Sequence, residues 1–163
     1  MKCIEYQYAQ GSMEWHHARL GIPTASGFCN ILTPAGKPTK SAARQTYMHK
    51  LLGERLTGKP MLNFVSAAME RGIELEPKAR EWYAFDRGVE VRQIGFATLE
   101  PFQGMLGCSP DGLVDPEGGI EIKCPLLGTM IAYLLADGPP EDYQMQVQAC
   151  LWITGRQWWD LVA

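Results

Sequence analysis

The sequence predicts an α/β domain in α+β-like order, with a central mixed sheet flanked by helices. Apolar residues recur at helical spacing in the first half of the chain, and from Val89 their spacing changes to two, as in half-buried strands. Helical segments return after Pro125, and the chain closes on a short strand, WWDLV. This order of helices, strands, helices and strand is typical of one sheet covered by helices.

Helices dominate the predicted N-terminal half. The segment 15–32 contains LGIPTAS, which predicts a turn before a short helix capped by Thr24 or Ser26. Two prolines, a glycine and two lysines indicate a loop over 33–40. An apolar stripe at helical spacing then predicts a helix over 41–57, and the glycine after it is expected to end that helix.

A second long helix is expected over 66–88, with a proline inside it. Because Pro77 lacks a backbone donor, this helix is expected either to break near Gly72 or to kink above Ile73.

The C-terminal half is expected to supply the sheet. Period-two patterns predict one strand over 89–99 and two or three short strands within 102–124. Helices are expected over 129–136 and 141–153, before the final strand 158–162.

Length and composition limit the class of protein. A chain of 163 residues with 46% hydrophobic content predicts a single domain over 1–163. Because the chain stops on an edge strand, we expect that a C-terminal extension is missing from this sequence. Only 20% of residues are charged and 10% are aromatic, which argues against disorder. No apolar run approaches the roughly 18 residues of a membrane span and no signal peptide is visible, so a soluble intracellular protein is expected.

Charge and cysteine usage exclude two further classes. The net charge of −3 argues against a uniformly basic nucleic-acid binder, although a local basic channel remains compatible with it. Five cysteines without a CxxC pair argue against a disulfide scaffold, a zinc ribbon or an iron–sulfur cluster, so free thiols are expected.

Two short motifs, SPDG and GIEIKCP, carry the candidate chemistry. Glu121 and Lys123 are two apart on a predicted strand and therefore share a face, and the turn holding Asp111 can return beside Glu121. Two converging carboxylates suit Mg²⁺ or Mn²⁺, and a neighbouring lysine adds positive charge near a metal-bound water. The alternative is an ordinary half-buried strand with a turn before it.

A third acidic residue comes from the segment ERGIELEPKAR. On a helix Glu70 and Glu74 share one face, whereas Glu76 points elsewhere. If Pro77 opens a fresh helical turn, Glu76 lies at its N-terminal mouth, near the predicted metal. The alternative is a solvated face carrying Glu70, Glu74 and Lys78.

The sequence resembles the phage lambda exonuclease or YqaJ-type viral recombinase family of PD-(D/E)xK nucleases, from Trp15 to about Val162. The motifs that carry the resemblance occur in the family's order. They are Trp15-x3-Arg19-Leu20-Gly21 with Thr24-Ala25-Ser26; Tyr47-x-His49-x-Leu51-Leu52; Gly72-x3-Glu76-x2-Ala79-Arg80; Cys108-Ser109-Pro110-Asp111-Gly112; and Glu121-x-Lys123-Cys124-Pro125, followed by Tyr143-x2-Gln146-Val147-Gln148.

The resemblance implies a restriction-endonuclease-like core with a metal-dependent active site. Asp111 and Glu121 would bind the metal, with Glu76 and the backbone carbonyl of Ile122 completing its shell. Lys123 would be the catalytic lysine. The implied cofactor is Mg²⁺, for which Mn²⁺ would substitute.

Further roles follow from the same resemblance. Gln146 falls at the family's active-site glutamine, and Gln148, two residues on, would face elsewhere. Arg19, Ser26 and Ser109 fall where the family binds a terminal 5′-phosphate, and a guanidinium with two hydroxyls suits a dianion.

Peripheral DNA contacts are predicted from the residues themselves. Lys37, Lys40 and Arg44 lie on or beside a predicted loop and could contact the phosphate backbone. Met69 is a candidate wedge at the duplex end. The adjacent His16 and His17 are expected to be structural or surface residues. Packing is expected for one helical histidine and three tryptophans: His49, Trp152, Trp158 and Trp159.

The predicted function is that of a deoxyribonuclease, an alkaline-type Mg²⁺-dependent 5′→3′ exonuclease. It would act on double-stranded DNA ends, release 5′-mononucleotides and leave a 3′ single strand for phage-type recombination. The resemblance also implies a ring-shaped homotrimer, a single-strand annealing partner, and a phage or prophage protein in the cytoplasm of a bacterial host. The alternatives are another PD-(D/E)xK nuclease, either RecB-type or an endonuclease, and a non-catalytic metal-binding interaction module.

Overall fold

The main sheet of the computed structural model, which describes residues 2–61, 66–136 and 140–163, has the strand order β2-β4-β5-β6. These strands are β2 (Val91–Arg92), β4 (Gly112–Val114), β5 (Gly118–Ile122) and β6 (Trp158–Val162). β4 pairs antiparallel with β2 and with β5, whereas β5 pairs parallel with β6. The sheet is therefore mixed, which confirms the predicted fold class.

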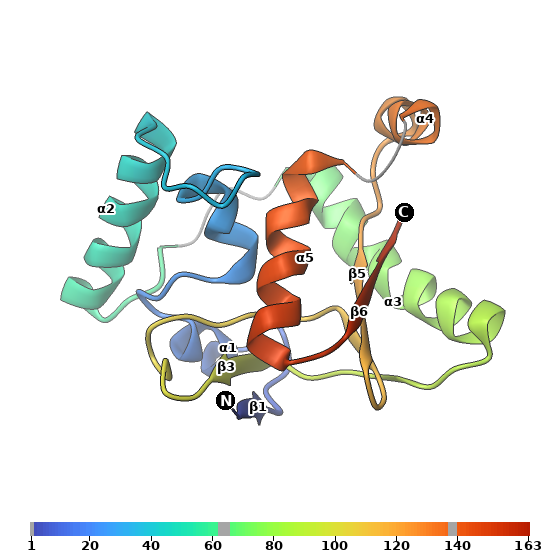
Figure 1. Ribbon diagram of the computed structural model, residues 1–163, viewed down its shortest axis with the longest axis horizontal. Coiled ribbons are helices and arrows are strands. Elements are labelled where there is room, and N and C mark those ends of the chain that lie inside the picture. The colour runs from blue at the N-terminus through green and yellow to red at the C-terminus, as the bar shows by residue number, and fades with distance from the viewer. Residues whose placement is uncertain (1, 62–65, 137–139) are drawn as a thin grey trace.

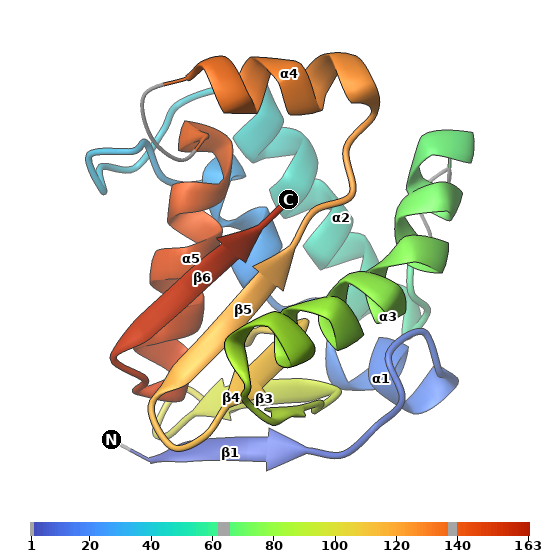
Figure 2. The same cartoon turned by 90° about the vertical axis from the view of Figure 1, so that its right-hand side faces the viewer.

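Two helices cover opposite faces of this sheet. Helix α3 (Ala67–Arg87) lies on one face and α5 (Glu141–Thr154) on the other (Figures 1 and 2). Neighbouring residues of β4 alternate between these helices: Leu113 belongs to the core cluster that contains α5 residues, and Val114 to the cluster that contains Tyr83 of α3. The period of two thus reflects the alternation of side chains between the two faces of the sheet, both of which are buried at β4.

The remaining helices connect and flank these layers. They are α1 (Met13–Ala18), the 3₁₀ helix η1 (Ala25–Asn30), α2 (Ala42–Thr57) and α4 (Leu127–Leu135). The predicted short helix after Thr24, the helix over 41–57 and both C-terminal helices are confirmed to within two residues. α1 was not predicted.

The prediction of one strand over 89–99 is wrong. Its second part, β3 (Phe96–Leu99), leaves the main sheet and pairs antiparallel with an unpredicted strand, β1 (Cys3–Tyr6). Gly95 lies at the separation, where an added Cβ would fall 2.0 Å from the carbonyl oxygen of Tyr8. The close passage of the N-terminal chain thus requires glycine at this point.

Helix α3 runs unbroken through Pro77, so the predicted break near Gly72 is wrong. Figure 2 shows that the helix bends along its length, in agreement with the alternative of a kink. Glu76 consequently lies inside a helix, and its predicted position at a helix N-terminus is also wrong.

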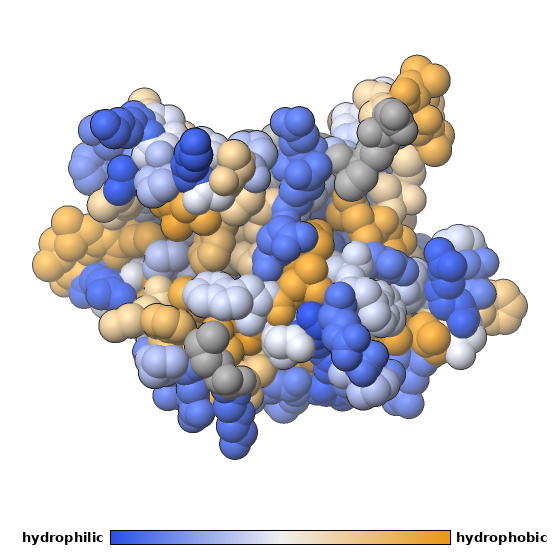
Figure 3. All heavy atoms as spheres, viewed as in Figure 1, coloured by the Kyte–Doolittle hydropathy of each residue, from blue (hydrophilic) through white to orange (hydrophobic). Residues whose placement is uncertain are grey.

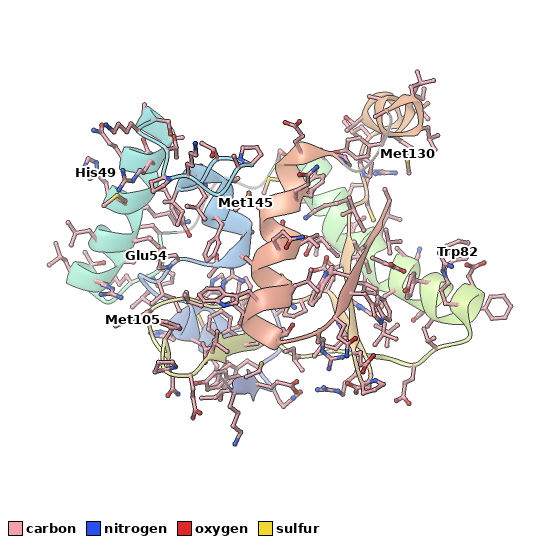
Figure 4. The ribbon with its side chains drawn as sticks, viewed as in Figure 1. His49, Glu54, Trp82, Met105, Met130 and Met145 are labelled. Atoms are coloured by element: carbon pink, nitrogen blue, oxygen red, sulfur yellow. The ribbon has the colours of Figure 1, made fainter. Side chains whose placement is uncertain are left out.

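The apolar stripe of α2 does not pack into the core. Glu54 is the buried residue of this helix, and its carboxylate accepts from the backbone N–H groups of Gly21 and Met61 at 2.9 and 3.0 Å. Figure 4 shows Glu54 directed toward the body of the protein. Apolar side chains gather instead on the outer surface of α2 and on α4 (Figure 3). Those of α2 that are exposed are Met48, Leu52 and Leu56.

Three packing predictions also need correction. His49 is exposed on α2 (Figure 4). Trp152 and Trp158 keep 45% and 39% of their surface exposed, because they lie at the edge of the packed layers. Trp159 does pack against the main core cluster. Within the described residues, no helix is both long and apolar enough to cross a membrane.

Candidate active site

A buried carboxylate lies at the end of the central strand β5. Glu121 is 1% exposed, and its Oε1 accepts from Nζ of Lys123 and from Nε2 of Gln146, each at 2.6 Å. Lys123 shares the strand face of Glu121 as predicted, and its Nζ also lies 4.8 Å from the ring centre of Tyr143. Glu121, Lys123 and Gln146 therefore form one hydrogen-bonded group drawn from β5 and α5.

Asp111 joins this group from the turn before β4. Its Oδ2 accepts from the backbone N–H of Ile122 at 2.7 Å, which fixes the carboxylate beside the end of β5. Burial raises the pKa of Asp111 to about 8, and the neighbouring charges of Glu121 and Glu76 add to the shift. Burial and like charge thus outweigh the Lys123 ammonium and the Ile122 N–H, which act to lower this pKa.

Burial also raises the pKa of Glu121, although Lys123 and Gln146 oppose this shift. Its second oxygen, Oε2, is buried without a hydrogen-bond partner among the described residues. Burying a carboxylate oxygen without a partner costs folding free energy unless a cation or a hydrogen-bond donor contacts it. A divalent ion with oxygen ligands fits this requirement.

The described side chains do not form a ready-made metal cage. No group of three acidic, thiol or imidazole side chains in this part of the chain is arranged to hold an ion unaided. Mg²⁺ is usually bound by one or two carboxylates, several waters and substrate phosphates. Asp111 and Glu121 supply that number, so the residues present fit Mg²⁺ or Mn²⁺ with water and phosphate oxygens as the remaining ligands.

Glu76 approaches the site from helix α3. Its carboxylate forms an ion pair and hydrogen bond with Arg80, one helical turn further on. Arg80 also donates from Nε to the backbone carbonyl of Asp111 at 2.7 Å. The sequence motif contained Arg80 but assigned it no role. Its spacing of four residues from Glu76 was the available signal.

The three predicted phosphate-binding residues lie in one region. Nη1 of Arg19 donates to Oγ of Ser109 at 2.7 Å, and the Trp15 indole donates to the same oxygen at 2.9 Å. The guanidinium also stacks over Trp15, with 3.9 Å between its carbon and the ring centre. Burial lowers the pKa of Arg19 to about 10, so it remains a cation at neutral pH.

A pocket of about 470 Å³ connects Arg19 with Ser26. Ser26 is exposed, and its hydroxyl lies 3.4 Å from that of Thr24. The pocket wall also contains polar residues that sequence reasoning missed as contributors: Thr24, Asn30, Thr46, Tyr47 and Lys50. Ser109, which accepts from Arg19, is two residues from Asp111 in the chain.

The remaining predicted residues lie outside this group. Lys37 and Lys40 are exposed before α2, and Arg44 donates to the carbonyl of Thr39 at 3.1 Å. Met69 is 52% exposed in the first turn of α3. Gln148 lines a separate groove along β6. The structure brings together Asp111, Glu121, Lys123, Glu76 and Gln146 in one site and Arg19, Ser26 and Ser109 in another, and every assigned role stays a prediction.

Comparisons with known proteins identify the family and support the fold. Residues 14–157 match the YqaJ-like viral recombinase domain. The structure is similar to that of an alkaline exonuclease, LHK-Exo, from Laribacter hongkongensis, with 43% identity, a TM-score of 0.81 and coverage of 92% of this chain and 72% of that one. The structure of LHK-Exo in complex with dAMP gives 42% identity, a TM-score of 0.82 and the same coverage.

A third structure supports the fold alone. The phage-related exonuclease from Haemophilus somnus is 17% identical, with a TM-score of 0.58 and coverage of 86% of this chain and 68% of that one. A comparison with curated proteins found no significant match. The predicted resemblance and the predicted enzyme class, a nuclease, are confirmed, and the chain belongs to the YqaJ-like viral recombinase domain family.

Proposed function

We propose that this protein is a Mg²⁺-dependent deoxyribonuclease that digests double-stranded DNA from its 5′ ends. It releases 5′-mononucleotides and leaves a 3′ single strand that can enter recombination. The observation that carries the proposal is the buried Glu121 carboxylate, which is bonded to Lys123 and Gln146 through one oxygen and lacks a partner for the other among the described residues. The dAMP complex of LHK-Exo supports a mononucleotide as product.

The residues that would hold the ion are Asp111 and Glu121, with Glu76 and the carbonyl of Ile122 in support. When bound, a divalent ion lowers the pKa of a coordinated water and stabilises negative charge on the phosphate. Mn²⁺ also prefers oxygen ligands and is expected to replace Mg²⁺.

Lys123 and Gln146 orient the attack on the scissile phosphate. The Lys123 ammonium is held 2.6 Å from Oε1 of Glu121, so it can bond the attacking water and place its oxygen for in-line displacement. The amide of Gln146 fixes the same carboxylate oxygen. Glu121 therefore keeps one orientation during the attack.

Arg19, Ser26 and Ser109 select the DNA end. A terminal 5′-phosphate carries two negative charges and fits a pocket with a buried guanidinium and hydroxyl groups. An internal phosphodiester is linked on both sides and cannot enter such a pocket. Because Ser109, the partner of Arg19, is two residues from Asp111, a bound end presents its first phosphodiester to the acidic site.

A digestion assay tests the proposal and its alternatives. Linear duplex with a label at either the 5′ or the 3′ end is incubated with Mg²⁺, and closed circular DNA is treated in parallel. Early release of the 5′ label as a mononucleotide, with the circle intact, is the expected result. Linearised circles would indicate an endonuclease, and metal binding without hydrolysis would indicate an interaction module.

We further propose that copies of the chain form a trimeric ring around the duplex and act with a single-strand annealing protein in the bacterial cytoplasm. The family resemblance supports this, as do the exposed apolar residues of α2 and α4, since surface clusters of this kind commonly mark protein interfaces. Light scattering during gel filtration tests the assembly, and a monomer at all concentrations would contradict it.

A further inference from the structure

Arg80 connects helix α3 to the turn that carries Asp111. Its Nε donates to the Asp111 carbonyl at 2.7 Å, and a terminal nitrogen donates to Oε1 of Glu76. In the amide orientation that satisfies its own hydrogen bonds, Gln93 accepts from both terminal nitrogens, at 2.8 and 3.2 Å. The Arg80 side chain is only 11% exposed, and all its nitrogens are engaged.

These contacts constrain two carboxylates that come from separate elements. Asp111 is held on both sides, by Arg80 at its backbone carbonyl and by the Ile122 N–H at its Oδ2. Glu76 keeps 30% of its side chain exposed and would otherwise sample several rotamers. With Oε1 fixed by Arg80, Oε2 is the oxygen left for an ion or for its bound water.

Arg80 and Lys123 neutralise different carboxylates of the site. Glu76 and Glu121 both act on Asp111 through like-charge repulsion. Lys123 pairs with Glu121, and Arg80 pairs with Glu76. Through its ion pair with Glu76 and its bond to the Asp111 carbonyl, Arg80 keeps the acidic residues together before a cation arrives.

We infer that Arg80 is a positioning residue that sets the affinity of the acidic site for its divalent ion, by aligning Glu76 with Asp111. This inference rests on the proposed metal-dependent function. Arg80 itself acts through the two carboxylates and needs no contact with DNA.

The test is calorimetric titration of the full chain with Mn²⁺ in the absence of DNA. Arg80→Lys keeps the charge but loses the planar fork that reaches Glu76, Gln93 and Asp111 together. We expect it to weaken Mn²⁺ binding about 10- to 100-fold, the usual effect of removing a residue that orients metal ligands. The matched control is Arg71→Gln, on the same helix, because Arg71 donates only to the carbonyls of Cys124 and Pro125 among the contacts described.

Melting curves identify any variant that fails to fold, and Glu76→Gln provides a second route. It should also weaken Mn²⁺ binding, and adding Arg80→Lys to it should weaken binding less than the same change does in the wild type, because only the contact with Asp111 is then lost. Folded Arg80→Lys or Glu76→Gln with wild-type affinity would overturn the inference, even if hydrolysis fell. Wild-type protein that binds Mn²⁺ but digests no DNA would refute the proposed function alone, and failure of the wild type to bind Mn²⁺ would refute both.

Discussion

The Lys123 ammonium lies 2.6 Å from Oε1 of Glu121, a carboxylate that is almost fully buried. Replacing Lys123 with alanine should therefore lower the rate of hydrolysis at least about 100-fold, the usual range for a group that orients or transfers a proton. Binding to DNA ends should persist, because the phosphate pocket is separate. Fluorescence anisotropy with Ca²⁺ measures binding, and gel assays with Mg²⁺ measure cleavage. Lys78→Ala, at an exposed position on α3, is the control. Full activity of Lys123→Ala would remove Lys123 from the mechanism.

End recognition should depend on Arg19. Removing the 5′-phosphate from the duplex should slow digestion by the wild type about tenfold or more, since charge-assisted hydrogen bonds to one phosphate are lost. Arg19→Ala should digest both kinds of end at the same low rate. Initial rates on matched duplexes provide the comparison, with Arg87→Ala as a control at a distant exposed arginine. Equal wild-type rates on both ends would argue against the pocket.

The raised pKa of Asp111 predicts how pH affects the stability of the metal-free protein. The pKa rises from 3.8 to about 8, so between these values the folded state binds a proton that the unfolded state has released. Stability from this group is complete below pH 4 and is lost as pH rises through 8. Asp111→Asn carries no such charge, so with chelator present it should melt higher than the wild type at pH 9, by about 3 °C or more.

At pH 3, below both pKa values, the two proteins should melt at similar temperatures in chelator. Saturating Mn²⁺ should raise the wild-type melting temperature at pH 8 and leave Asp111→Asn nearly unchanged, because the ion stabilises only the state that binds it. A wild-type protein that melts at the same temperature as Asp111→Asn at every pH, with or without Mn²⁺, would show that Asp111 bears no raised pKa and holds no ion.

Local sequence signals predicted strand β5 well. The alternation in GIEIK follows from the two faces of β5, with Ile120 and Ile122 in the core cluster of Tyr83 and Glu121 bonded to Gln146 of α5. The PDG turn brings Asp111 back through one bond to Ile122. Both signals act over about ten residues, so one sequence suffices to read them. The capping serines of α2 and α3, Ser41 and Ser66, fix helix starts in the same local way.

Contacts between residues far apart in the sequence could not be predicted from such local patterns. The pairing of β1 with β3 joins residues 90 to 96 positions apart, and no local pattern specifies that partner. The stripe of α2 has the correct period but faces outward, because amphipathic spacing does not say which neighbour exists to cover it. Arg80 was assigned no function because its role depends on Gln93 and Asp111, which come from other elements.

Glu54 should contribute to stability rather than to catalysis. Its buried carboxylate satisfies the backbone N–H groups of Gly21 and Met61, so Glu54→Ala leaves two donors without their partner. The expected loss is about 1–3 kcal/mol of unfolding free energy for each donor that stays buried. Urea denaturation followed by circular dichroism measures it, with Glu81→Ala at an exposed position as control. Equal midpoints for the two variants would contradict the anchoring role of Glu54.

Gly119 is required by the packing of two parallel strands. It pairs with Trp159, and a Cβ added at Gly119 would fall 2.4 Å from the Trp159 ring. Because Trp159 packs against the main core, its ring cannot move away without disturbing that core. Gly119→Ala should therefore lower the free energy of unfolding by about 1–3 kcal/mol, as overpacking of a close-packed core usually does.

Gly128→Ala is the matched control, since an added Cβ there meets no atom within 4 Å and alanine favours the helix. Thermal and urea unfolding should show Gly119→Ala destabilised and Gly128→Ala equal to or above the wild type. If Gly119→Ala were as stable as the wild type, β5 and β6 would be able to move apart at little cost, and the contact with Trp159 would not require glycine.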